Sequence, residues 1–181
     1  MRIVAGAWRG RTLTTPSGNE TRPTADRVRQ ALFDVILHAP WAGRPFLEGA
    51  SVLDAFAGTG ALGLEALSRG ADRAVFVERS PAALAVLRAN IAVCRAVDRC
   101  TVLPVDALAI PAGKRVDLVF LDPPYDENLI DRTLTHLRSV GRVGPGTLIV
   151  TETRRDEPAP DVDILSERTH GIARITIWRE E

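Results

Sequence analysis

Leu53-Asp54-Ala55-Phe56-Ala57-Gly58-Thr59-Gly60-Ala61-Leu62-Gly63 is the stretch of sequence that decides the fold. It joins an apolar strand predicted over residues 51–56 to a helix predicted over residues 60–69 and closed by Gly70. The spacing Gly58-x-Gly60-x-x-Gly63 matches the dinucleotide-binding fingerprint, although helix-packing glycines can produce the same pattern. Such a loop lets the backbone approach a ligand at the N-terminus of the helix. The sequence therefore predicts a strand–loop–helix unit that binds a ligand.

The same alternation of strands and helices continues downstream. Further strands are predicted over residues 74–78, 101–105, 116–121 and 147–153. Ser80-Pro81 starts one intervening helix, and another is predicted over residues 127–137. Two last strands, 161–165 and 173–178, have no helix between them and should pair antiparallel. The pattern predicts an α/β fold with a mostly parallel sheet, whose ligand site lies at the carboxyl strand ends near the topological switch point.

The N-terminal segment is expected to be an extension of this domain. Two short strands around Trp8 predict a β-hairpin within residues 1–20, and residues 21–181 form the main domain. Thr24 is expected to cap a helix whose apolar residues recur at helical spacing. Residues 1–30 hold six arginines against two acidic residues, although the chain as a whole has no net charge. A cluster of arginines near one end of the chain favours a nucleic acid partner.

The composition excludes several classes of protein. The 181 residues are 45% apolar and 25% charged, as in an ordinary globular domain. No apolar run reaches the roughly 20 residues of a membrane span, and Met1–Gly6 lacks the apolar core of a signal peptide. Cys94 and Cys100 form no metal-binding pattern, so neither a metal site nor a disulfide is expected. We expect a cytoplasmic monomer.

Four acidic residues are expected on one rim of the sheet, because each falls at the end of a predicted strand: Asp54, Glu78, Asp106 and Asp122. Glu78 stands where an acid that binds a ribose belongs, so the glycine loop and Glu78 alone leave a nicotinamide dehydrogenase as an alternative. The acidic rim would repel a pyrophosphate. It would attract S-adenosylmethionine, which has a sulfonium and an ammonium but no phosphate. Asp106 is a candidate for the adenine amine, or else a turn or helix cap.

Asp122-Pro123-Pro124-Tyr125 is the most specific motif in the chain. Two prolines fix the backbone and remove two donors, so the local carbonyl groups are held rigid. If Asp122 and the Pro123 carbonyl accept hydrogen bonds from the two N–H groups of an exocyclic amine, the lone pair of that nitrogen can point at the sulfonium methyl. Tyr125 offers a stacking face for an extruded base. The motif predicts methylation of a nucleobase amine by proximity and electrostatics, without a strong general base.

With these motifs the chain resembles the RsmD-type 16S rRNA (guanine-N2)-methyltransferases along its whole length. The matching stretches are Arg2-Ile3-Val4-x-Gly6-x-x-Arg9-Gly10-Arg11, Arg22-Pro23-Thr24-x-Asp26-Arg27-Val28-Arg29-x-Ala31-Leu32-Phe33, the glycine loop and Asp122-Pro123-Pro124-Tyr125. The first two are the more specific to this family. The chain departs from the family near its C-terminus, where Arg168-x-His170-Gly171-x-Ala173 replaces Lys-x-Tyr-Gly-x-Thr. His170 is expected to be a loop residue.

The resemblance implies the class I, Rossmann-like methyltransferase fold, with a seven-stranded sheet whose C-terminal strand is antiparallel. It implies S-adenosylmethionine as cofactor, S-adenosylhomocysteine as product, and 16S ribosomal RNA, naked or in a small-subunit particle, as partner. The expected cofactor-binding residues are Arg22, Pro23, Thr24, Asp54, Phe56, Ala57, Gly58, Gly60, Glu78, Arg79, Asp106, Ala107 and Asp122. The expected catalytic residues are Asp122, Pro123, Pro124 and Tyr125, and the expected RNA-binding residues are Arg2, Trp8, Arg9 and Arg11.

Two further alternatives remain open at the level of sequence. An adenine-N6 methyltransferase acting on DNA or RNA would need the same two acceptors, so the Asp-Pro-Pro-Tyr motif does not exclude it. Only the match of the N-terminal stretches favours guanine. A non-enzymatic RNA-binding module is the other alternative, and the intact motif argues against it.

Overall fold

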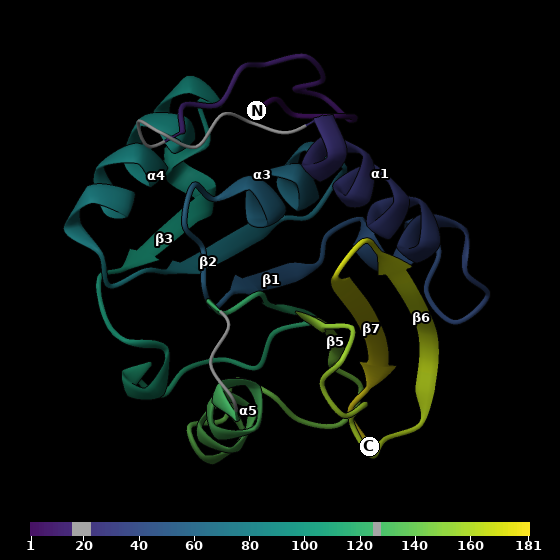
Figure 1. The fold of residues 1–181 in the computed structure, drawn as a ribbon. Coiled ribbons are helices and arrows are strands. Elements are labelled where there is room, and N and C mark those ends of the chain that lie inside the picture. The colour runs from purple at the N-terminus through teal and green to yellow at the C-terminus, as the bar shows by residue number, and fades with distance from the viewer. Residues whose placement is uncertain (16–22, 125–127) are drawn as a thin grey trace.

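A computed structural model describes residues 1–15, 23–124 and 128–181. These residues form one seven-stranded sheet in the order β3-β2-β1-β4-β5-β7-β6 (Figure 1). Strands β1 to β5 are parallel, and β7 is antiparallel to both of its neighbours. The strands are β1 (Ser51–Asp54), β2 (Arg73–Val77), β3 (Cys100–Leu103), β4 (Leu118–Leu121), β5 (Leu148–Arg154), β6 (Ile164–His170) and β7 (Ala173–Arg179). The predicted fold class is confirmed.

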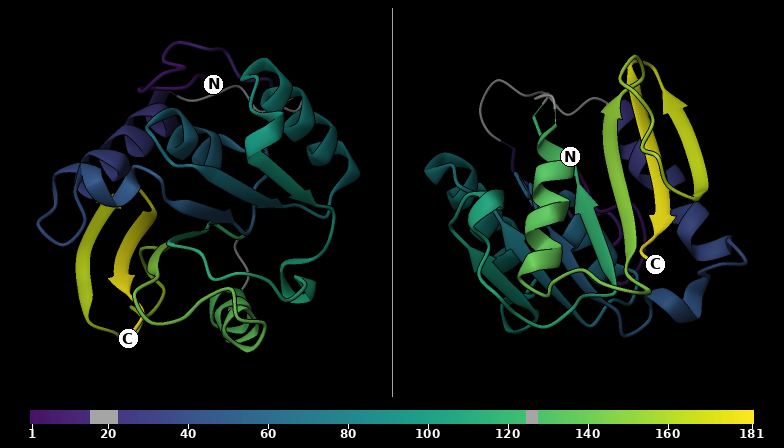
Figure 2. Two further views of the ribbon diagram at one scale, coloured as in Figure 1. Left: turned by 180° about the vertical axis from the view of Figure 1, so that it is seen from behind. Right: turned by 90° about the horizontal axis from the view of Figure 1, so that it is seen from below.

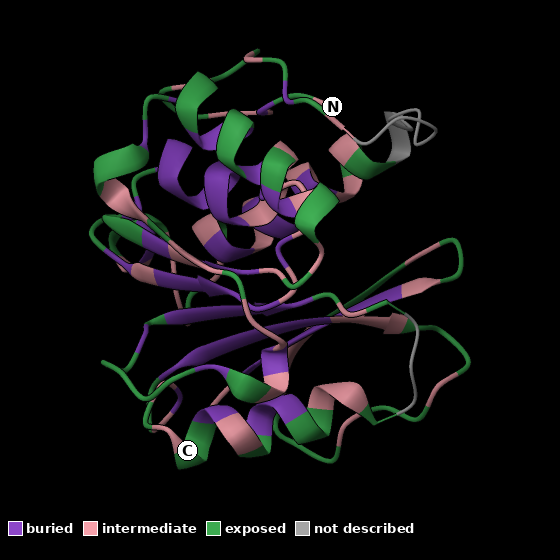
Figure 3. Ribbon diagram, turned by 90° about the vertical axis from the view of Figure 1, so that its left-hand side faces the viewer, coloured by how far each residue is buried: buried purple, intermediate pink, exposed green. Residues whose placement is uncertain are grey.

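Helices cover both faces of this sheet. Helices α1 (Pro23–His38), α3 (Ala61–Ser68) and α4 (Pro81–Val93) lie on one face, and α5 (Leu129–Ser139) lies on the other (Figures 1 and 2). The remaining helices are short: α2 (Arg44–Leu47), η1 (Val97–Arg99) and η2 (Ala107–Ala109). The central strands β1 and β4 are buried between the two layers and are mostly apolar, whereas the edge strands β3 and β6 are partly exposed (Figure 3). Among the described residues, no helix is both long and apolar enough to cross a membrane.

Local sequence signals, such as helix caps, predicted most of these elements. Ser80 caps α4, because its hydroxyl accepts a hydrogen bond from the Ala83 amide at 3.4 Å and Pro81 follows it. The prediction of a strand over residues 161–165 is wrong, because β6 begins at Ile164 and runs to His170. Strand β6 is an edge strand that pairs only with β7 and carries polar, exposed residues, so apolar periodicity does not mark it. His170 therefore ends a strand instead of lying in a loop.

The N-terminal arm, residues 1–15, forms a hairpin-like turn rather than two regular strands. One antiparallel bridge joins Arg2 and Thr12, and the Ile3 amide donates to the Arg11 carbonyl at 2.9 Å. Ile3 and Leu13 are buried in the core under this arm. Glu65 on α3 anchors it, because the two carboxylate oxygens accept hydrogen bonds from the Val4 and Ala5 amides at 2.8 and 2.9 Å. The arm thus packs on the layer formed by α1, α3 and α4.

Candidate active site

The glycine loop lies between β1 and α3, and its three glycines have different physical roles. Gly58 has a φ of 51°, and a Cβ on it would meet no atom within 4 Å, so its backbone faces open space. A Cβ on Gly63 would lie 2.3 Å from the Phe76 ring, so this glycine lets α3 pack on β2. Gly60, with a φ of 80°, would meet the Leu87 side chain at 2.5 Å. Gly60 and Gly63 therefore serve packing, whereas Gly58 borders open space.

Two of the rim acids hold this loop in place. The Asp54 carboxylate is buried at the end of β1 and accepts a hydrogen bond from the Gly63 amide at 3.1 Å. Burial raises the pKa of Asp54 to about 7, against the lowering effect of that hydrogen bond. Glu78, directly after β2, accepts from the Gly58 amide at 3.0 Å and from the Ser80 amide at 2.7 Å. A carboxylate has about four acceptor positions, so Glu78 keeps capacity for a ligand.

A cavity of about 490 Å³ opens beside Glu78, and we call it the β2–β3 cavity. It is lined by Phe56, Gly58, Val77, Glu78, Arg79, Val105, Asp106, Ala107, Leu108, Asp122, Pro124, Leu129 and Arg132, among others. Asp106 caps η2 by accepting from the Leu108 amide at 2.9 Å, and it pairs with Arg79 at 2.7 Å. Both hydrogen bonds lower the pKa of Asp106. Asp106 therefore shapes this cavity as a cap, which was its alternative interpretation from sequence.

Asp122 lies at the switch point of the sheet, where β1 and β4 are neighbours although they are not consecutive. It lines the β2–β3 cavity and also a second cavity of about 470 Å³, which we call the β4–β5 cavity. Its carboxyl group is accessible from these cavities but recessed among protein atoms. Desolvation raises its pKa, and the nearby carboxylates of Glu152 and Asp54 raise it further. A cation bound in either cavity would favour the ionised form of the Asp122 carboxyl group.

Of two further residues in the β4–β5 cavity, Glu152 was missed by the sequence analysis and His170 was expected only as a loop residue. Glu152 on β5 and His170 at the end of β6 both line this cavity, together with Asp122 and with Met1 and Arg29 from the N-terminal part of the chain. Glu152 directly follows the buried run Leu148–Thr151, just as Asp122 directly follows β4. An acid at the carboxyl end of an apolar strand was the available signal.

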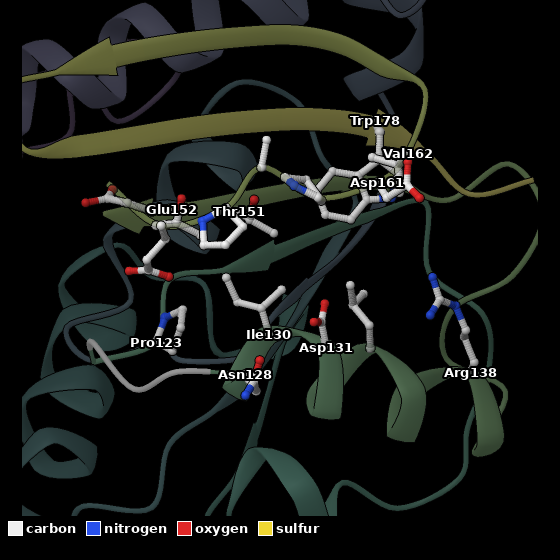
Figure 4. A pocket seen from close by; sticks show the side chains of 16 residues that line it. Pro123, Asn128, Ile130, Asp131, Arg138, Thr151, Glu152, Asp161, Val162 and Trp178 are labelled. Atoms are coloured by element: carbon white, nitrogen blue, oxygen red, sulfur yellow. The ribbon is translucent and has the colours of Figure 1, made fainter. Parts of the chain in front are cut away.

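A third cavity of about 480 Å³ lies between α5 and the end of β5, and we call it the α5 cavity (Figure 4). Pro123, Asn128, Ile130, Thr151, Glu152 and Trp178 contribute to its wall. It shares Thr151 and Glu152 with the β4–β5 cavity. The three cavities therefore surround the segment Asp122–Pro124 and the end of β5.

The structure brings most of the predicted cofactor residues together, but not all of the predicted site. The predicted residues that line the first two cavities are Asp54, Phe56, Ala57, Gly58, Glu78, Arg79, Asp106, Ala107 and Asp122. Gly60 lines neither, because it packs against Leu87. Arg22 and Tyr125 lie outside the described residues. Pro23 and Thr24 are placed only as the first residues of α1, so the predicted cap at Thr24 is not described.

Three of the predicted RNA-binding residues, Trp8, Arg9 and Arg11, lie at the tip of the arm, whereas Arg2 follows Met1, which lines the β4–β5 cavity. The Trp8 amide donates to the Ser68 hydroxyl at the end of α3, and Arg11 donates to the Val93 carbonyl at the end of α4. Helices α3 and α4 both run from the cofactor rim to the opposite edge of the sheet, so these contacts lie at that far edge. Trp8 is half-buried under the Arg99 guanidinium, whereas Arg9 is exposed. The hairpin tip is therefore not beside the active site.

These residues fit S-adenosylmethionine. The open space at Gly58 admits a ligand to the backbone, Glu78 has free acceptor positions, and Asp122 and Asp54 have raised pKa values that a cation would relieve. Fold and site together define an S-adenosylmethionine-dependent methyltransferase. The chain belongs to the family described as conserved hypothetical protein 95, whose model matches residues 1–179 and which is the RsmD family indicated by the motifs. The dehydrogenase alternative is thereby set aside.

Similar proteins cover the full chain. Ribosomal RNA small subunit methyltransferase D of Escherichia coli strain K12 is 38% identical, over 100% of this chain and 90% of its own. The protein of the same name from Haemophilus influenzae is 33% identical, over 99% of this chain and 93% of its own. The solved structure of Escherichia coli yhhF superposes with a TM-score of 0.86 at 34% identity, covering 100% of this chain and 98% of that one.

We expect Glu78→Ala to weaken S-adenosylmethionine binding by about 10-fold to 150-fold, because hydrogen bonds to a charged acceptor contribute roughly 1.5–3 kcal/mol. The variant also loses the acceptor that holds the Gly58 and Ser80 amides. Titration calorimetry with S-adenosylhomocysteine checks the affinity, with the exposed Glu167→Ala on β6 as control. An unchanged dissociation constant would show that the cofactor is held elsewhere.

Proposed function

We propose that the protein transfers a methyl group from S-adenosylmethionine to the exocyclic N2 amine of a guanine in 16S ribosomal RNA. The observation that carries this proposal is the position of Asp122, which faces both cofactor-side cavities and precedes two prolines. The names of the relatives support ribosomal RNA of the small subunit as the substrate. The guanine target rests on the family resemblance.

The chain's own residues divide the work of holding the cofactor. Glu78 accepts hydrogen bonds from the ribose hydroxyls, and the β2–β3 cavity between Phe56 and Ala107 receives the adenine. The backbone at Gly58 and the residues of α1, with Arg22, Pro23 and Thr24 before and in its first turn, border the methionine end. S-adenosylmethionine supplies an electrophilic methyl group on a sulfonium centre. The carboxylates of Asp54 and Asp122 favour that positive charge.

The motif Asp122–Tyr125 positions the target amine. Asp122 and the Pro123 carbonyl accept hydrogen bonds from the two N–H groups of the amine. These hydrogen bonds turn the nitrogen lone pair toward the methyl group. Pro123 and Pro124 fix these acceptors before the base arrives, so little reorganisation is needed during the reaction. Tyr125 stacks on the extruded base. The methylated nitrogen loses one proton to solvent or to a nearby carboxylate after transfer, so no strong base is required.

The N-terminal arm contributes to RNA binding at a distance from the target base. Arg2 and Arg9 are exposed on the arm, and guanidinium groups bind phosphates bidentately. Arg9 lies at the tip of the arm, and Arg2 lies nearer the β4–β5 cavity, next to Met1, so the two suit different phosphates that flank the modified nucleotide in a folded RNA. We therefore propose that residues 1–20 form an RNA-contacting extension of a catalytic domain that spans residues 21–181. The protein acts as a monomer on naked RNA or on a small-subunit particle.

Replacing Arg9 and Arg11 together by alanine is expected to weaken RNA binding and to reduce its salt dependence. Each lost phosphate contact lowers the slope of log K against log salt concentration by about one unit. Cofactor affinity stays at the wild-type value, because both side chains lie far from the cavities. Fluorescence anisotropy with a small-subunit RNA fragment at several salt concentrations measures the slope, and Arg115→Ala is the control. A wild-type slope would make the arm purely structural.

The substrate class is tested with methyl-labelled S-adenosylmethionine and separate pools of RNA, DNA and small-subunit particles from cells that lack the gene. We expect label in small-subunit RNA, supplied either naked or in particles, and none in DNA. Label in DNA alone would favour the adenine-N6 alternative and would overturn the proposal.

A further inference from the structure

Glu152 lies beside Asp122 on the neighbouring strand. In the parallel pairing of β4 and β5, Leu121 is the register partner of Thr151, so Asp122 and Glu152 each follow one position later. Phe120 and Val150, two residues earlier on each strand, are buried in the core under α1. Because side chains alternate along a strand, Asp122 and Glu152 project to that same face. Two carboxyl groups therefore lie next to each other at the carboxyl ends of the parallel strands, where the proposed function places the target amine.

Glu152 occupies the junction of the two cavities nearest these strand ends. It lines the β4–β5 cavity, which contains Asp122, and the α5 cavity, which contains Pro123 (Figure 4). A base whose exocyclic amine reaches Asp122 and the Pro123 carbonyl would lie at the cavities that Glu152 lines.

Among the described residues, no hydrogen bond is made by the Glu152 side chain, although His170 interacts with it electrostatically. The Glu152 carboxylate is half-buried. Burial raises its pKa, and His170 at the end of β6 opposes that rise. A carboxylate without a protein donor is free to accept a hydrogen bond from a ligand that displaces solvent from the cavity.

We infer that Glu152 accepts the N1–H of the target guanine and so makes the site specific for guanine over adenine. This inference rests on the proposed function. Guanine presents a ring N1–H donor next to its exocyclic amine, whereas adenine presents a ring nitrogen lone pair at the equivalent place. Three acceptors, Glu152, Asp122 and the Pro123 carbonyl, match the three donors of guanine N1 and N2. With adenine, the carboxylate would face a lone pair and lose its hydrogen bond.

The test compares two RNA substrates that share the 2-amine but differ at N1 and at C6, where 2-aminopurine lacks the guanine carbonyl; the variants separate the contribution of N1. First, the nucleotide methylated by the wild type is mapped; then a fragment is made with guanosine or 2-aminopurine riboside at that position. 2-Aminopurine keeps the 2-amine but has an acceptor at N1. The wild type is expected to favour guanosine in kcat/KM by about 10-fold to 150-fold, as for a hydrogen bond to a charged group.

Glu152→Gln is expected to reduce this preference at least 10-fold, because its amide can donate to the N1 of 2-aminopurine. Cofactor affinity is expected to stay unchanged. Glu167→Gln, an exposed acid on β6, is the matched control and keeps the wild-type preference. Glu152→Asp retains a carboxylate, so it is expected to keep the preference for guanosine at a lower kcat. This second variant serves if the amide variant does not fold.

A wild-type ratio of the two kcat/KM values in Glu152→Gln would overturn the inference, and so would an equal loss on both substrates. If Glu152→Gln does not fold, loss of the preference in a folded Glu152→Asp would overturn it. A wild-type target that is not a guanine would overturn the proposed function as well, and the mapping step reveals this before the variants are compared.

Discussion

Replacing Asp122 by alanine lowers the rate of methyl transfer by roughly 100-fold or more while S-adenosylmethionine still binds. Loss of one pre-organised polar contact at a reacting group typically has an effect of this size. Asp122 lines both cofactor-side cavities, but Glu78, Gly58 and Ala107 remain to hold the cofactor. Single-turnover kinetics with labelled cofactor gives the rate, and calorimetry with S-adenosylhomocysteine gives the affinity.

The control for this variant is Asp98→Ala, which removes an exposed carboxylate from η1 beside the edge strand β3. It is expected to keep wild-type values of both rate and affinity. Wild-type turnover in Asp122→Ala would remove Asp122 from the reaction. Loss of cofactor binding as large as the loss of rate would make it a cofactor-binding residue instead.

Glu65→Ala is expected to have the largest effect on stability, about 3–5 kcal/mol, because it leaves charged groups buried without their partner. Glu65 is fully buried and pairs with the Nε atoms of Arg29 at 3.3 Å and Arg69 at 2.7 Å. It also accepts the Val4 and Ala5 amides of the N-terminal arm. One side chain thus joins α1, α3 and the arm. Its loss removes the acceptor of both guanidinium Nε groups and of two amides, although Arg29 keeps Asp26 and Arg69 keeps Asp34.

Chemical denaturation measures this loss, with Glu167→Ala as the control at an exposed position of β6. The variant is also expected to bind S-adenosylmethionine more weakly, because Met1 and Arg29, which the Glu65 contacts hold in place, line the β4–β5 cavity. A change below about 1 kcal/mol, the size usual for a surface substitution, would contradict the role of Glu65 as a buried anchor.

The core of the site could be predicted from sequence because its signals are local. The glycine loop, Glu78 and the Asp-Pro-Pro-Tyr motif each lie within a few residues at the end of an apolar strand. Glu65 could not be predicted, because its partners Val4 and Ala5 are 61 and 60 residues away. Glu152 was missed because it belongs to no motif, and its meaning arises only from its strand register with Asp122.

For a related reason, local sequence patterns could not predict where β6 and the N-terminal arm lie. An edge strand is held by backbone hydrogen bonds to one neighbour, so its polar residues give no periodic signal. The arm carries a clear basic signal, but the chain cannot show which edge of the sheet it covers. Its contacts with the ends of α3 and α4 decide that.

The identity of the methylated nucleoside tests the central claim most directly. Small-subunit RNA from cells that lack the gene is incubated with the protein and methyl-labelled S-adenosylmethionine, digested to nucleosides and analysed by mass spectrometry. The proposed function predicts label in N2-methylguanosine, at one position of the RNA, and its absence with Asp122→Ala. Label in N6-methyladenosine, or no label in RNA at all, would contradict it.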